Sequence, residues 1–265
     1  MPFSLPGKDY VVVSPDGTIT LTVRVDGSVT LAVDCDGREV ISGLSPAMRL
    51  EGVSIPGSRP AVVRSVPSQV REMLTPVVPH KNSTVPDNYN AMSLRFRGGY
   101  SMEFRVSDDG IAYRFVTAMK DEVTVENEEF GFSLPDGTMA LWPLEKGFMS
   151  HNECTYLPAS ADTLGSGHLA SLPALFMADG VNILLTEADI RDYPGMWITG
   201  NGKGGVTGLF PAFPGAVRAY NDRNVYVTER EDYIARTSGT RTYPWRVFII
   251  TRDDEIGRAS CRERV

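Results

Sequence analysis

The sequence has few cysteines, fewer positive than negative charges, and no long apolar run. Its three cysteines, Cys35, Cys154 and Cys261, are odd in number and share no short metal-binding spacing, which argues against a disulfide framework or a zinc site. The formal net charge of -7 argues against a nucleic-acid partner, because such binding depends on clustered Lys and Arg. No run approaches the roughly 18 apolar residues of a membrane-spanning helix.

Helix signals and the common catalytic motifs are also missing. The nearest candidate for an amphipathic helix, residues 64–74, is interrupted by Pro67. The chain has no P-loop, no G-x-S-x-G, no H-E-x-x-H and no EF-hand spacing. The glycine-rich residues 201–208 have no strand before them and no helix after them, so we expect no nucleotide site there.

The patterns that are present are those of β-strands. Asp26-Gly27 and Asp36-Gly37 separate the β-rich runs "TITLTVRV", "SVTLAVDC" and "REVIS", and Asp-Gly pairs are typical of hairpin turns. Residues 89–117 alternate apolar and polar side chains, which is the pattern of an antiparallel sheet with one buried face. We therefore predict an all-β fold, a large antiparallel β-sandwich of two packed sheets.

The length of 265 residues suits one large sandwich domain, which we place at residues 1–256. Residues 257–265 carry several arginines without apolar periodicity and are predicted to be a non-native tail. Two Pro/Gly-rich segments, residues 157–173 and 200–215, are longer than ordinary loops. They are either binding or docking edges, or simple excursions between strands.

The segment "NILLTEADIRDYPGMW", residues 182–197, is the most informative for function. An apolar run leads to Glu187 and Asp189, and Tyr193 and Trp197 follow. Carboxylates at a strand end with aromatic side chains nearby suit a hard cation such as Ca²⁺, which takes oxygen ligands, or a sugar platform. The alternative is an edge strand whose acidic end faces water.

The other candidate residues carry weaker signals. His151 lies in a loop, and with Glu153 or Glu145 it would supply the acid–base pair of a sugar epimerase. Its alternative is a solvated loop histidine. Residues 126–130, "ENEEF", are predicted to form a solvated turn. In "RTYPWRV", residues 241–247, we expect the tryptophan in the core and the flanking arginines over the surface.

Four blocks in order resemble the amino-terminal domain of glycoside hydrolase family 97. They are "SPDGTITLTVRVDGSVTLAVDCDGREV", "YNAMSLRFRGGYSMEFRVSDDGIAYRF", "LLTEADIRDYPGMW" and "TRTYPWRVFIITRDD", and the match runs from about Tyr10 to Asp254. The most specific parts are "DDGIAYRF" and "TEADIRDYPGM". The resemblance implies a supersandwich of the galactose-mutarotase-like type, which packs in the whole enzyme against a (β/α)₈ barrel that this sequence lacks.

The resemblance also implies a function for the whole enzyme. Family members hydrolyse α-glucosidic or α-galactosidic bonds, by inversion in the first branch and retention in the second, with both catalytic carboxylates on the barrel. We therefore expect a non-catalytic domain of a Ca²⁺-dependent α-glycosidase whose partners are the missing barrel and, in the complete enzyme, an α-linked oligosaccharide. Alternatives are a free-standing carbohydrate-binding module or a mutarotase-like epimerase.

The site residues follow from the same resemblance. Family members hold Ca²⁺ mainly with barrel glutamates and with one glutamate from this domain, and Glu187 is the matching position. Asp189 and Tyr193 are expected to form the wall of the sugar pocket. A lone carboxylate cannot hold Ca²⁺, so we expect the metal only in the complete enzyme. The resemblance implies a periplasmic or secreted protein, although residues 1–10 lack the apolar core of a secretory signal.

Overall fold

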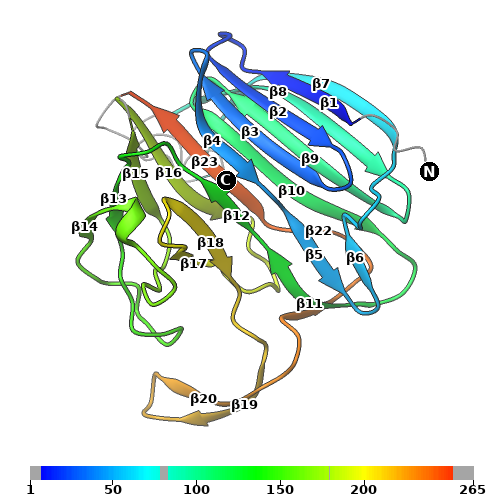
Figure 1. Cartoon of the computed structure of the whole chain (residues 1–265). Helices are drawn as coiled ribbons and strands as arrows, with labels where there is room; N and C mark the ends of the chain where they lie inside the picture. Colours follow the sequence, from blue (N-terminus) through cyan, green and yellow to red (C-terminus); the bar gives the residue numbers. More distant parts are fainter. Residues whose placement is uncertain (1–6, 78–82, 179, 253–265) are drawn as a thin grey trace, which may run out of the picture.

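The computed structural model describes residues 7–77, 83–178 and 180–252, and nearly all of its regular structure is β-strand (Figure 1). Within these ranges the one helical element is the 3₁₀ turn η1, Ala161–Thr163. The predicted all-β class is confirmed. The predicted tail at residues 257–265 lies outside the described residues. No described helix has the length and apolar character that a membrane span requires.

The first large sheet contains the predicted amino-terminal meander. Its seven strands have the order β1-β2-β3-β4-β12-β18-β17. They are β1 (Lys8–Val13), β2 (Ile19–Val25), β3 (Val29–Cys35), β4 (Arg38–Leu44), β12 (Gly131–Ser133), β17 (Trp197–Gly200) and β18 (Gly205–Leu209). Asp36 and Gly37 have φ angles of 50° and 74°, and two consecutive positive φ angles make the two-residue turn between β3 and β4 that Asp-Gly favours.

The second large sheet has ten strands in the order β14-β13-β15-β16-β23-β10-β9-β8-β7, with β22 also paired to β10. They are β7 (Val62–Leu74), β8 (Val85–Phe96), β9 (Tyr100–Ser107), β10 (Gly110–Ala118), β13 (Met139–Trp142), β14 (Leu157–Ser160), β15 (Ala174–Ala178), β16 (Val181–Ala188), β22 (Thr240–Thr242) and β23 (Trp245–Thr251). Pro67 lies in the edge strand β7, where the missing N–H costs the sheet little.

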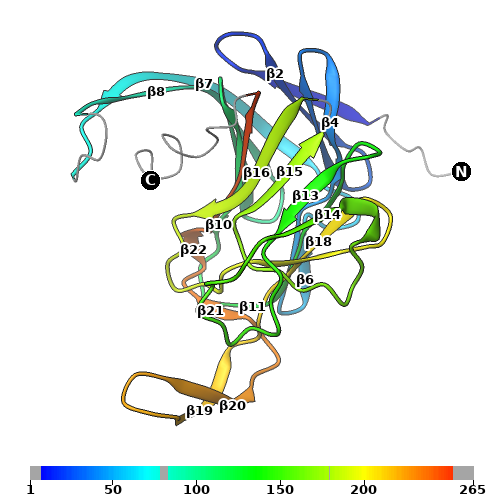
Figure 2. The same cartoon turned by 90° about the vertical axis from the view of Figure 1, so that its left-hand side faces the viewer.

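Two smaller sheets complete the described structure. One has the order β21-β11-β5-β6, and the other is the hairpin β19-β20. Their strands are β5 (Ala47–Leu50), β6 (Val53–Ile55), β11 (Val123–Glu129), β19 (Pro214–Ala219), β20 (Val225–Arg230) and β21 (Ala235–Thr237). The hairpin pairs with no other described strand and projects from one end of the molecule in both views (Figures 1 and 2).

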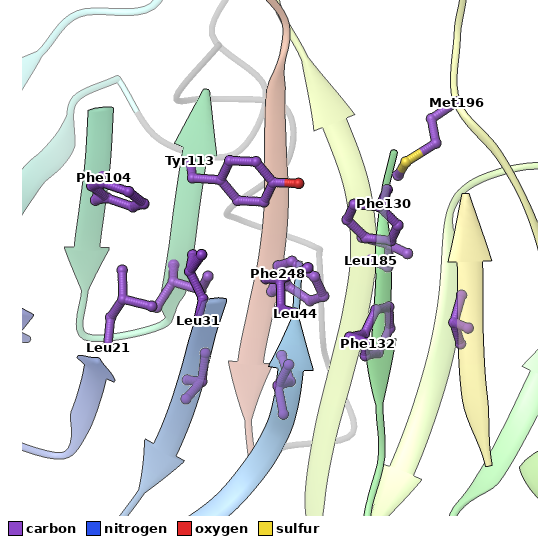
Figure 3. Packing of buried hydrophobic residues seen from close by; sticks show 14 of the residues in the cluster. Leu21, Leu31, Leu44, Phe104, Tyr113, Phe130, Phe132, Leu185, Met196 and Phe248 are labelled. Atoms are coloured by element: carbon purple, nitrogen blue, oxygen red, sulfur yellow. The ribbon is translucent and has the colours of Figure 1, made fainter. Parts of the chain in front are cut away.

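The core lies between the two large sheets, and aromatic rings join them (Figure 3). Phe132 on β12 meets Phe176 on β15 and Phe248 on β23 edge to face, with ring centroids 5.9 and 5.3 Å apart. Each such pair adds about 0.5–1.5 kcal/mol beyond the burial of its area. The two sheets are therefore held together by interlocking rings, which confirms the predicted sandwich.

We expect Phe248→Ala to lower the free energy of unfolding by about 3–5 kcal/mol, because it leaves a cavity where two other rings pack. Val66→Ala on the exposed side of β7 is the control and should change it by less than about 0.5 kcal/mol. Urea unfolding followed by circular dichroism measures both. Equal losses would contradict the assignment of Phe248 to the core.

Candidate functional site

The alternation of side chains along two neighbouring strands directs Glu187 and Arg246 into the sandwich. Glu187 follows Ile183 and Leu185 on the inner face of β16, two residues apart each time. Arg246 shares the inner face of β23 with Phe248. The two strands pair with Glu187 directly opposite Arg246, so an acidic and a basic side chain meet at the end of an apolar face.

Arg246 is the centre of a buried hydrogen-bond network. Its Nη1 donates to Glu187 Oε2 over 2.5 Å, and its Nε and Nη2 donate to the two carboxylate oxygens of Glu128 on β11, over 2.9 and 2.7 Å. Tyr193 Oη donates to Glu128 Oε2 over 3.0 Å. The side chain of Arg246 is 1% exposed and that of Glu128 is 3% exposed. Bidentate pairs of this kind combine strength with a fixed orientation.

The charges in this network are unbalanced. Burial by itself lowers the pKa of Arg246, but Glu128 and then Glu187 outweigh it and raise that pKa, so the guanidinium is protonated at any physiological pH. Burial raises the pKa of Glu187 above its ordinary value of 4.5, against the opposing effect of Arg246. Two carboxyl groups share one guanidinium in this network, so acidic groups outnumber basic ones beside Glu187.

A sharp bend returns the chain to Glu187 after β16 ends. Asp189 and Asp192 adopt left-handed φ angles of 58° and 47°. The bend brings the Met196 backbone N–H to the Glu187 carboxylate, 3.0 Å from Oε1 and 3.1 Å from Oε2. A Cβ atom at Gly195 would lie 3.1 Å from Oε1, so a glycine gives this approach its room. The motif "ADIRDYPGM" is thus the segment that holds the carboxylate.

The structure separates the other two predicted site residues. Asp189 lies at the surface, with Oδ1 3.1 Å from Arg191 Nε and Oδ2 3.8 Å from Arg114 Nη1. It borders two neighbouring hollows, of about 620 and about 990 Å³. Tyr193 lines the larger hollow, yet its side chain is mostly buried and its hydroxyl is bound to Glu128. Glu187 and Tyr193 therefore belong to one buried network, and Asp189 lies beside it.

The prediction of a solvated turn at residues 126–130 is wrong for Glu128. This residue lies within β11, and the pairing of β11 with β5 shifts register between Val125 and Asn127. After such a bulge the alternation restarts one residue later, so Glu128 faces inward where unbroken alternation would place Asn127. The sequence does not show where the bulge lies. Sequence reasoning therefore had no signal that Glu128 is buried.

The prediction that Arg246 covers the surface is also wrong, since it is buried at the centre of the network. Trp245 points to the opposite face of β23. It is buried there as well, because the guanidinium groups of Arg105 and Arg114 lie over its ring, 4.4 and 4.3 Å from the centroid. The prediction that Trp245 is buried is confirmed, but it lies beneath Arg105 and Arg114 and not in the core cluster between the sheets.

The predicted sugar platform and the predicted acid–base pair of an epimerase both lack the geometry of a site in this conformation. Trp142, Trp197 and Trp245 are all buried, so none of their faces is free to stack on a sugar ring. The Glu145 carboxylate accepts hydrogen bonds from two serine hydroxyls, Ser150 Oγ at 2.7 Å and Ser171 Oγ at 3.2 Å.

His151 is exposed. Within the described ranges no hydrogen bond joins it to Glu145 or Glu153, and the acid–base pair of an epimerase is not assembled there.

The donor chemistry at Glu187 fits one ligand of a hard cation but not a complete site. A carboxylate oxygen is the kind of ligand that suits Ca²⁺, which takes about six to eight oxygens. In residues 7–77, 83–178 and 180–252, however, no group of three or more His, Cys, Asp and Glu side chains gathers to hold a metal. Any further ligands have to come from elsewhere.

Comparison with known proteins places this chain in a family. The family model described as "Glycosyl-hydrolase 97 N-terminal" matches residues 12–256. The chain belongs to this glycoside hydrolase family. It has the family's amino-terminal domain, with the network of Glu128, Glu187, Tyr193 and Arg246 inside the matched range.

The similar proteins are all longer than this domain. A retaining α-galactosidase of Bacteroides thetaiotaomicron is 29% identical over 261 residues, which cover 94% of this chain and 39% of that enzyme. A family 97 enzyme of Pseudoalteromonas sp. strain K8, solved with acarbose, has a TM-score of 0.78 at 17% identity over 92% of this chain and 36% of its own. A β-arabinopyranosidase has a TM-score of 0.76 at 19% identity and is covered to 40%.

Arg246→Met should lower the free energy of unfolding by about 3–5 kcal/mol, since it leaves two buried carboxylates without their cation. Adding Glu128→Gln and Glu187→Gln removes both charges and should recover about 2 kcal/mol of that loss. Urea unfolding of the single and triple variants measures the difference. If the triple variant is less stable than Arg246→Met alone, charge burial is not the cause.

Proposed function

We propose that the chain is the non-catalytic amino-terminal domain of a Ca²⁺-dependent α-glycosidase. In this proposal it packs on a catalytic barrel elsewhere in a longer polypeptide and lends Glu187 to the metal. The observation that carries the proposal is the clamped Glu187 carboxylate, fixed by Arg246 and the Met196 amide in a cluster of two carboxyl groups and one guanidinium.

Two features of the site support a ligand role for Glu187. It sits at the end of a regular strand and is held from two sides, and a rigid position of this kind can aim a ligand accurately. No group of three or more His, Cys, Asp and Glu side chains gathers around it in the described residues, so in this proposal further oxygens come from another part of the polypeptide. This domain spans only 36–40% of the length of the relatives. Those proteins therefore contain additional residues outside the domain.

The substrate class in this proposal is an α-linked glycoside. The relative at 29% identity is named a retaining α-galactosidase, which makes an α-galactoside the first compound to test and an α-glucoside the second. Asp189, at the rim of both hollows, is the better placed of the two pocket-wall candidates, because the Tyr193 hydroxyl is already bound to Glu128. A periplasmic or secreted location belongs to the same proposal.

The chain by itself should release no p-nitrophenol from an α-galactoside or an α-glucoside, whereas the longer protein that contains it should hydrolyse at least one of the two. The physical reason is that both catalytic carboxylates would lie outside this domain. A chromogenic assay on the two proteins tests this. Hydrolysis by the chain alone would contradict the proposal. Saturable quenching of its tryptophan fluorescence by melibiose would instead favour a carbohydrate-binding module.

In the longer protein, Glu187→Gln should weaken Ca²⁺ binding at least about tenfold, because it replaces an anionic oxygen ligand with a neutral amide. Isothermal titration calorimetry of metal-stripped protein measures the dissociation constant. Glu39→Gln, in the exposed part of β4, removes the same charge far from the site and should leave the constant unchanged. An unchanged constant in Glu187→Gln would remove Glu187 from the metal site.

A further inference from the structure

The projecting hairpin β19-β20 exposes apolar side chains to solvent. Val217, Tyr220, Val225 and Tyr226 are 40% to 64% exposed, and no other described sheet pairs with either strand. A two-stranded hairpin on its own is marginally stable in water. We call residues 213–230 the arm. Its position at one end of the sandwich, away from the core, is visible in both views (Figures 1 and 2).

The base of the arm and the bend after Glu187 border one hollow. The hollow has a volume of about 990 Å³, and its walls include Phe213 and Val227 of the arm and residues 192–194 of the bend. It therefore opens beside the network that holds Glu187. The arm and the bend are brought to the same end of the molecule by strands that belong to different sheets.

The walls of this hollow are positively charged on a chain whose net charge is -7. Arg230, Arg236 and Arg241 line it, and none of the three forms an ion pair with a carboxylate in the described ranges. Their guanidinium groups lie instead near the rings of Phe148, Tyr233 and Tyr243. An aromatic ring carries no net charge, so it does not neutralise a guanidinium.

Carboxylates do not cancel this charge. Asp189 and Asp192 are the acidic side chains in the walls, and Arg191 is a fourth arginine there, so four positive charges face two negative ones. Asp189 is already engaged by Arg191 and Arg114. An occupant that brings carboxylates next to apolar side chains would complement both the hollow and the arm.

We infer that the arm and this hollow form the surface on which a carboxylate-bearing, partly apolar part of the same longer polypeptide docks. The inference rests on the proposed function, because it needs chain beyond this domain. The relatives supply the reason to expect such chain, since this domain covers 39% of the retaining α-galactosidase and 36–40% of the solved structures. A second copy of this domain fits less well, since symmetric pairing through the hollow would bring like charges together.

Hydrogen exchange tests the docking without any substitution. In the longer protein, the backbone amides of residues 215–230 should exchange at least about tenfold more slowly than in the isolated chain, because docking covers the arm. The amides of β7, at the far edge of the ten-stranded sheet, are the internal reference and should exchange alike in both proteins. Equal exchange of the arm in the two proteins would overturn the inference.

Charge reversal tests the part played by the arginines. Arg230→Glu with Arg236→Glu should lower the melting temperature of the longer protein by at least about 3 °C at low salt, and by less at high salt, with no comparable change in the isolated chain. Arg64→Glu with Arg95→Glu reverses two exposed arginines on β7 and β8 and is the matched control. Equal shifts for the two pairs would overturn the role of the hollow.

The outcomes separate this inference from the proposed function. A longer protein that hydrolyses an α-glycoside but leaves the arm unprotected would keep the function and reject the docking surface. Protection of the arm in a longer protein without hydrolase activity would support the docking surface and reject the function. A dimer of the isolated chain that Arg230→Glu with Arg236→Glu abolishes, seen by light scattering, would assign the surface to a second copy instead.

Discussion

The buried guanidinium of Arg246 is the constraint on which the functional end of this domain depends. An unpaired charge with 1% exposure would cost several kcal/mol, so the fold has to bring carboxylates to it. It does so from two separate strands, with Glu128 from β11 and Glu187 from β16. One charge thereby ties the four-stranded sheet that contains β11 to the ten-stranded sheet, and any variant that frees the guanidinium should loosen both.

The same constraint fixes the carboxylate of Glu187 in place. Arg246 holds one of its oxygens, and the Met196 amide is close to both, so the carboxylate has one orientation before any partner arrives. A fixed carboxylate loses little further freedom when it binds a cation, which favours binding. Glu128 engages Arg246 through both of its oxygens and so fixes the guanidinium that holds Glu187.

The bend that holds Glu187, the hollow and the arm meet at one end of the domain. Elsewhere interlocking rings join the two large sheets, and the edge strand β7 exposes apolar side chains of its own. Relatives with this fold are named for different sugars, a galactoside in one case and an arabinopyranoside in another, so the fold alone does not select a substrate. Under the proposed function and the proposed docking surface, the domain is a support that presents one carboxylate and one docking end.

The sequence by itself determined the β class, the amino-terminal meander and the family resemblance, because side-chain alternation, Asp-Gly turns and short ordered motifs depend on near neighbours in the chain. It also singled out Glu187, through a local motif, as a metal ligand, and that role stays a prediction. Only the tertiary structure decided that Glu128 and Arg246 are its partners. A bulge in β11 turned Glu128 inward, and strand pairing set Arg246 opposite Glu187, 59 residues away. Both are consequences of register between distant segments, which no local pattern encodes.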